Sequence, residues 1–192
     1  MANADTPFGF KPVQHRNGAP YNGAARRYSV AAGDGTAIYI GDPVKLAGTS
    51  QIIDGQVYAD VVQGTTTAAV VGVVVGVVAD TRDSLTYRAA NTQRVLLVAD
   101  DPALLFEIQE VSGGTALAAN DIGLNAAFVV GSGSAVTGLS GVELNNSGEA
   151  TTNTLDVQIM GLVSRPDNAG GEHAKWLVRL NNHQYNNQVA GV

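Results

Sequence analysis

The feature that most constrains the fold of this chain is an apolar run, AAVVGVVVGVVA, at positions 68–79. The run is too short for a membrane helix, which needs about 20 apolar residues. Valine is stiff at its first side-chain torsion and favours the pleated surface of a sheet. Gly72 and Gly76 lie four positions apart, as expected for a bulge or a close approach of two backbones. The run therefore predicts a buried strand.

Other short apolar segments, separated by turn residues, predict further strands. They lie at 36–40, 41–46, 51–62, 85–89, 94–99, 104–111, 128–130, 142–144, 155–160 and 174–180. Between the two halves of 51–62, the pair Asp54-Gly55 favours a tight hairpin turn. Within 104–111, Phe106 and Ile108 share one face by the two-residue period of a strand, and we expect both in the core.

This succession of short strands, at spacings of roughly 8–15 residues and without a long amphipathic helix, is typical of an all-β protein. A single β-sandwich or β-barrel, jelly-roll-like or tulip-like, fits the pattern, and the sequence leaves these two forms open. One helix is an alternative at 103–111, where Asp101-Pro102 would begin it. The length of 192 residues, 45% of them hydrophobic, is that of one domain with a sizeable core.

Residues 1–30 differ from the remainder of the chain. They contain three prolines and no periodic apolar pattern, so we expect no regular element there but an extended N-terminal arm, followed by a β-rich body at 31–192. Four aromatic residues are too many for a solvated tail, and they should anchor the arm on its own body or on a neighbour. The arm carries a net charge of +3, whereas residues 31–174 carry −11. The arm of one copy could therefore lie on the acidic body of a neighbouring copy.

The sequence contains no recognisable catalytic motif. It has no cysteine, which excludes disulfides, thiolate zinc sites and cysteine nucleophiles. His15, His173 and His183 lie far apart, and we expect structural or surface roles for them, with no metal and no cofactor. Neither a phosphate-binding glycine loop nor a serine-nucleophile elbow is present, so no small-molecule substrate is expected.

The one enzymatic alternative rests on two pairs of carboxylates at the ends of apolar strands. The pairs are Asp80 with Asp83 and Asp100 with Asp101. They would suit a glycan-processing β-sandwich or a calcium site, but neither spacing is diagnostic. Because Arg82 and Arg88 lie nearby, we favour solvated turns with local ion pairs.

Charge and hydropathy also limit the partners. With 17 acidic and 11 basic residues the net charge is −6, which opposes binding to nucleic acid. The N-terminal residues MANADTPFGFKPV lack the apolar centre of a signal peptide, and no segment is long enough to span a membrane as a helix. We therefore expect protein partners.

Four segments carry a resemblance to a known family. ANADTPFGFKPV at the N-terminus, RNGAPYNGAARRY after it, GDPVKL at 41–46 and WLVRLNNHQYNN near the end resemble small virion structural proteins of tailed bacteriophages. Some members of that family are head decoration or cement proteins. The likeness runs from end to end and is strongest at the termini. GDPVKL followed by VVGVVVGVVAD is also similar to the turn and barrel strands of small β-barrel decoration proteins.

The resemblance implies a cement protein and not an enzyme. Such a protein binds the outer surface of the head shell, bridges neighbouring subunits of the major capsid protein, and is often a homotrimer near local three-fold axes. It would be made in the host bacterial cytoplasm and located on the capsid surface of the virion. A tail, connector or spike-base component of the same virion is the alternative.

The contact residues that we expect all lie in the arm. Aromatic residues would supply apolar area, and basic residues would set the register against an acidic surface. The aromatic residues are Phe8, Phe10, Tyr21 and Tyr28, and the basic residues are Lys11, Arg16, Arg26 and Arg27.

Overall fold

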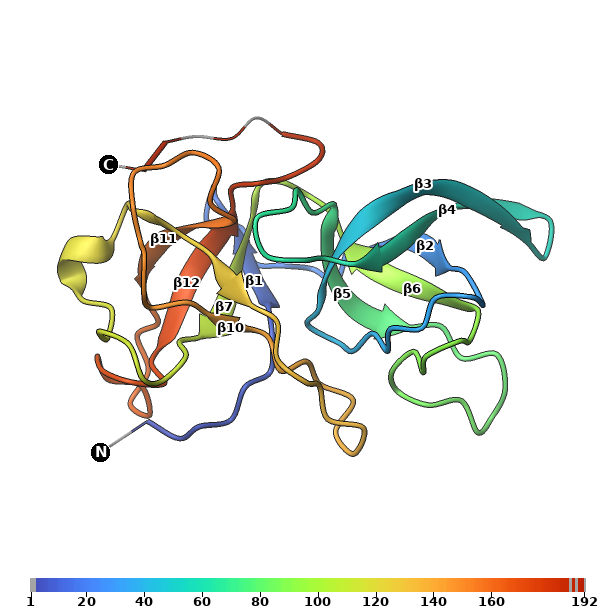
Figure 1. Ribbon diagram of the computed structural model, residues 1–192, viewed down its shortest axis with the longest axis horizontal. Coiled ribbons are helices and arrows are strands. Elements are labelled where there is room, and N and C mark those ends of the chain that lie inside the picture. Colours follow the sequence, from blue (N-terminus) through green and yellow to red (C-terminus); the bar gives the residue numbers. More distant parts are fainter. Residues whose placement is uncertain (1–2, 187, 189, 192) are drawn as a thin grey trace.

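The computed structural model describes residues 3–186, 188, 190 and 191, and it is all-β, as predicted. Residues 1, 2, 187, 189 and 192, which belong to the predicted arm and body, lie outside this description. The strands form two lobes that lie side by side along the long axis of the molecule (Figure 1). We call them the sheet lobe and the barrel lobe.

The sheet lobe is built on a five-stranded antiparallel sheet. Its strands follow the order β1 (Lys11–His15), β7 (Leu104–Gln109), β12 (Lys175–Leu180), β11 (Val157–Leu162) and β8 (Asn125–Ala126). A two-stranded ribbon of β9 (Phe128–Val129) and β10 (Glu143–Leu144) belongs to the same lobe, together with one 3-10 turn, η1 (Ala119–Asp121). The helix considered at 103–111 is not formed, because Leu104–Gln109 pairs as a strand with both β1 and β12.

The barrel lobe is a closed barrel of five strands. They are β2 (Arg26–Val30), β4 (Gln56–Gln63), β3 (Pro43–Ile53), β5 (Gly72–Val77) and β6 (Arg94–Ala99), in that order around the barrel. Its core is mainly aliphatic and rich in β-branched valine. Such side chains fill the narrow interior of a small barrel well.

An aromatic cluster closes the sheet lobe. The ring of Phe10 packs edge-on against Phe106 of the sheet and against Phe128 of the ribbon, with centroid distances of 6.0 and 5.8 Å. The ribbon and the N-terminal segment thus cover one face of the sheet, as in a sandwich. The sequence leaves sandwich and barrel open, and the molecule contains a lobe of each kind.

Strand β5 confirms the prediction from the valine run, and it serves both cores. Val73 belongs to the sheet-lobe core and Val74 to the barrel core, because successive side chains of a strand point to opposite faces. A β-carbon on Gly72 would lie 2.3 Å from the carbonyl oxygen of Ala99, so the two backbones do approach closely. The predicted bulge lies at Gly76, where the register with β6 shifts.

The predicted hairpin joins β3 to β4. Asp54 and Gly55 have φ values of 51° and 77°, both in the left-handed region, as the primed turns of two-residue hairpins require. The end of this hairpin projects from the barrel, away from the sheet lobe (Figure 1).

Three predicted features are wrong in detail. Residues 1–30 do contain regular elements, β1 and β2; β1 is an edge strand with a bulge beside Pro12, and edges tolerate proline. Segments 36–40 and 85–89 are not strands, and they share only the isolated bridge between Ile38 and Arg88.

No helix within the described ranges has the length and apolar character needed to cross a membrane.

Arg88, one of the two residues of the isolated bridge, is a buried charged residue. Its side chain is fully buried, and the guanidinium donates to the carbonyl oxygens of Ala31 (2.8 Å), Thr36 (2.5 Å) and Thr92 (2.7 Å). Asp34 lies 3.5 Å away as its counter-ion. One buried guanidinium thus satisfies three backbone carbonyl groups. Arg88 pairs with Asp34 and not with the carboxylates of the two predicted pairs, and it is buried in place of lying in a solvated turn.

Candidate binding groove

A groove with a volume of about 580 Å³ opens where the N-terminal segment meets both lobes. Apolar and aromatic side chains supply most of its wall, and four charged side chains complete it. The apolar and aromatic residues are Phe8, Phe10, Pro12, Tyr21, Ile40, Val74, Val75 and Leu139, and the charged residues are Lys11, Glu107, Arg165 and Lys175. Concave apolar sites with a few charged groups are typical of binding sites.

Two glycines allow the N-terminal segment to form one wall of this groove. Gly9 has a φ of 72° and Gly41 a φ of 96°, and a β-carbon on Gly9 would lie 2.5 Å from the carbonyl oxygen of Gly41. That same oxygen accepts a hydrogen bond from the backbone N–H of Phe10 at 2.9 Å. Residues 8–10 are therefore fixed by direct backbone contact with the start of the GDPVKL segment.

The charged side of the groove comes from three distant parts of the sequence. Lys11 faces Glu107 across the β1–β7 pair. Arg165 binds Glu107 through two hydrogen bonds, at 3.1 and 2.6 Å, in the bidentate geometry that arginine favours. Lys175 lies 3.7 Å from Asp167. Among the described residues Lys11 forms no ion pair, so the side chains that line the groove carry a positive excess.

The eight predicted contact residues fall into three groups. Phe8, Phe10, Lys11 and Tyr21 come together in the groove. Arg26 and Tyr28 lie where the two lobes join, and Arg16 and Arg27 are exposed. Four of the eight predicted contact residues thus line one cavity, which the sequence did not show.

Two of the four predicted aromatic contacts are core residues of their own chain. Phe10 and Tyr28 are each only 2% exposed. The Tyr28 hydroxyl donates to Asp100 at 2.8 Å and lies 3.4 Å from the Tyr185 hydroxyl, while Arg26 lies 3.2 Å from the same carboxylate. Burial, together with the hydrogen bonds to Tyr185 and Asp100, raises the pKa of Tyr28 well above its usual value. For these two residues the structure agrees with the alternative in which the segment packs on its own body.

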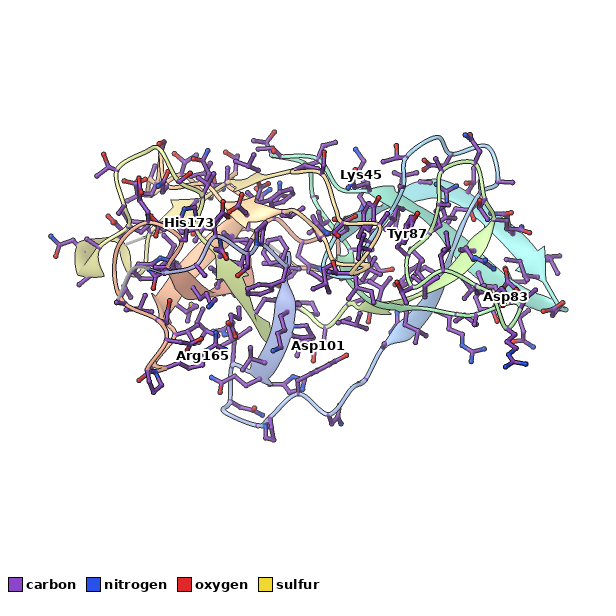
Figure 2. All side chains as sticks on the ribbon, turned by 90° about the horizontal axis from the view of Figure 1, so that it is seen from below. Lys45, Asp83, Tyr87, Asp101, Arg165 and His173 are labelled. Carbon is purple, nitrogen blue, oxygen red and sulfur yellow. The ribbon has the colours of Figure 1, made fainter. Side chains whose placement is uncertain are left out.

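The two carboxylate pairs do not meet in one cleft. Figure 2 shows Asp83 near the outer end of the barrel lobe and Asp101 near the middle of the molecule. Asp80 pairs with Arg94 and Asp100 with Arg26, while Asp101 lies 3.2 Å from His15; none of these partners is Arg82 or Arg88, which the sequence had suggested. The four carboxylates are therefore not gathered in a single cleft.

Sequence reasoning missed one cluster of titratable groups on the sheet lobe. Asp5, Glu143 and His173 each place a ligand atom within 4.8 Å of the others; His173 is labelled in Figure 2. The amide of buried Gln109 lies among them, 3.2 Å from Asp5, 3.5 Å from Glu143 and 3.3 Å from His173. The cluster is therefore internally hydrogen-bonded and fastens the N-terminal segment to the sheet. No spacing in the sequence could have revealed it.

Comparisons of the chain with protein-family models, with curated proteins and with solved structures find no match.

Proposed function

We propose that this chain is a structural protein of a tailed-bacteriophage virion, of the head decoration or cement type. It binds the outer surface of the shell through the groove and bridges neighbouring subunits of the major capsid protein. The observation that carries this proposal is the gathering of Phe8, Phe10, Lys11 and Tyr21, all in segments that resemble the virion family, around one apolar groove.

The chemistry of the groove supports a protein partner. Its apolar wall suits inserted aliphatic or aromatic side chains, and its positive excess suits a nearby carboxylate on the partner. A protein that binds many equivalent sites on the assembled shell, but not the separated subunits, stabilises the shell by linkage. Few charges and compact β lobes are well suited to such a passive, durable role.

The test is binding to undecorated shells of the cognate capsid protein, measured by co-sedimentation. Phe8→Asp places a charge on the groove wall outside any strand, and we expect it to weaken binding about tenfold or more, the cost of one interface hot spot. Val136→Asp, at a 95% exposed loop position, is the matched control and should bind as the wild type does. Equal binding by both variants would remove the groove from the proposal, and absence of wild-type binding would overturn the cement role.

The copy number in the purified virion distinguishes the cement role from the tail, connector or spike-base alternative. A cement protein is present at a number of copies comparable to that of the capsid protein, whereas a connector component is present in a handful. A quantitative gel against the capsid band measures this ratio directly.

A further inference from the structure

The end of the β3–β4 hairpin carries two large apolar side chains that its own chain leaves uncovered. Ile52 is 74% exposed and Val57 is 70% exposed, and the two residues lie directly opposite each other across the hairpin. By the two-residue period of a strand, Val57 lies on the same face of β4 as Val61, which is buried in the barrel core. The core-facing side of this strand therefore continues beyond the barrel without a cover.

The hairpin is held in one conformation before it meets any partner. Buried Asp60, at its base, accepts hydrogen bonds from Ser29 (2.6 Å), Thr49 (2.7 Å) and Gln51 (2.5 Å). The ladder and the Asp54-Gly55 turn fix its end. Binding by a segment that is already ordered costs little conformational entropy.

The groove has the complementary properties. It is concave and mostly apolar, whereas the hairpin end is convex and apolar. The charges are also opposite. The groove lining has an excess of positive charge, and Lys11 forms no ion pair among the described residues. In the hairpin end, Asp54 is the only charged residue between positions 50 and 59. The hairpin points away from the sheet lobe, so it does not fill the groove of its own chain (Figure 1).

We infer that the groove binds the hairpin end of a second copy of this chain, with Ile52 and Val57 against the apolar wall and Asp54 beside Lys11. This contact is head-to-tail, since it joins two different surfaces, and it leaves a free hairpin on one copy and a free groove on the other. Copies can then continue to add at either end, and the assembly closes as a ring only where the rotation between copies allows it. The inference rests on the proposed function in treating the groove as a protein-contact site, and it names a second copy as an occupant that competes with the shell for this groove.

The first test measures the mass of the purified protein by light scattering after size exclusion, over a roughly hundredfold range of concentration. We expect the wild type to associate as concentration rises and Ile52→Ser/Val57→Ser to remain at one chain mass. Val136→Ser, which removes a still more exposed valine (95%) from a loop, should associate as the wild type does. A wild type that stays at one chain mass, or a double variant that associates normally, overturns the inference.

The second test uses the absence of cysteine from the chain. Ile52→Cys and Phe8→Cys proteins are prepared separately, mixed and oxidised. We expect disulfide-linked dimers mainly in the mixture, because the hairpin of one copy meets the groove of another. Dimers formed equally by Ile52→Cys alone would place hairpin against hairpin, and they would overturn the inference. Val136→Cys mixed with Phe8→Cys is the control for random collision.

The ionic contact has its own readout. Asp54→Asn keeps a residue that tolerates the left-handed turn, and Lys11→Gln removes the charge of an exposed side chain but keeps a polar group on a stem one bond shorter. Each should weaken association several-fold, and the double variant should be no weaker than either single one, because both remove the same interaction. Strictly additive losses would contradict the pairing. The two proposals can fail separately. If the wild type never self-associates but Phe8→Asp still loses shell binding, the proposed function stands and this inference alone is overturned.

Discussion

The two lobes form their cores in different ways. The barrel closes on itself, so short β-branched side chains from its own strands fill it. The sheet lobe is open, and its core depends on large rings from separate segments: Phe10, Phe106, Phe128 and Trp176. A closed sheet supplies its own cover, whereas an open sheet has to obtain one from elsewhere in the chain. Here the N-terminal segment is part of that cover.

The two lobes also differ in the pKa of a buried aspartate. Asp60 in the barrel accepts three side-chain hydrogen bonds; burial alone would raise its pKa, but these bonds together lower it. Among the described residues, the Asp156 carboxylate in the sheet lobe accepts hydrogen bonds from the backbone N–H groups of Thr67 and Phe128 alone, and burial raises its pKa to about 6. The balance between burial and hydrogen bonding decides which way the pKa moves: the three side-chain donors outweigh burial at Asp60, whereas burial outweighs the two backbone donors at Asp156.

The largest effect that we expect tests the cover of the open sheet. Phe10→Ala removes the ring that joins Phe106 to Phe128, and it should lower the free energy of unfolding by about 3–5 kcal/mol, as deletion of a core aromatic does. Phe8→Ala, two positions away and only half-buried, should cost much less. Urea denaturation of both variants gives the comparison. Equal small losses would show that the N-terminal segment is dispensable to the sheet lobe.

A second effect concerns the pH dependence of stability. The folded-state pKa of Asp156, about 6, lies above its ordinary value of 3.8, so the folded protein holds this proton more tightly than the unfolded chain does. Stability should therefore be greatest below pH 4 for this group and fall as the pH rises towards 6, by up to about 3 kcal/mol. Asp156→Asn should abolish that fall.

The measurement for Asp156 is urea denaturation at several pH values, with the variant curve subtracted from that of the wild type. The subtraction matters because burial also raises the pKa of Asp42 and of Glu110. Asp60 has the opposite sign: its lowered pKa gives stability at neutral pH that is lost as the pH falls below about 4. If the difference curve for Asp156→Asn stays flat between pH 4 and 6, the two aspartates do not differ as described.

A third effect tests the strand that both lobes share. Gly72→Ala would bring a β-carbon to 2.3 Å from the Ala99 carbonyl oxygen, a backbone atom that cannot turn aside, and it should cost about 1–3 kcal/mol. Gly76→Ala meets only the flexible end of the Leu97 side chain, at 3.3 Å, and should change stability little. Comparing the thermal unfolding of the two variants distinguishes a clash at the close approach of the backbones from the general effect of replacing glycine with alanine in this strand. A loss of equal size at both positions would contradict the close approach.

Local patterns were sufficient for the strands whose side chains alternate or whose turn has a defined chemistry. Residues 94–99 form β6 over the predicted range, and Asp54-Gly55 makes the predicted turn. The division into two lobes could not be predicted, because it depends on which distant strands pair, such as β1 with β7. Hydrophobic periodicity marks a strand but not its partner.

The groove itself was not predicted, although four residues that line it were named as contact residues. The aromatic and basic residues of 1–30 drew attention to Phe8, Phe10, Lys11 and Tyr21, which are close together in the sequence. The rest of the site comes from residues far along the chain; Glu107 and Arg165, for example, meet only after the sheet has formed. No spacing rule connects such positions, so only the folded structure shows them together.

The smallest effect tests where the barrel ends. Val57 and Val61 lie on the same face of β4, but Val61 is fully buried and Val57 is 70% exposed. Val57→Ser should therefore change the free energy of unfolding of the monomer by no more than about 0.5 kcal/mol, as a surface substitution does. Val61→Ser, the same change four residues further along, places a hydroxyl in the barrel core and should be clearly destabilising. A marked loss of unfolding free energy for Val57→Ser in dilute monomeric protein would mean that the hairpin end stabilises its own barrel. The exposed apolar pair would then be explained by the stability of this lobe and not by contact with another copy.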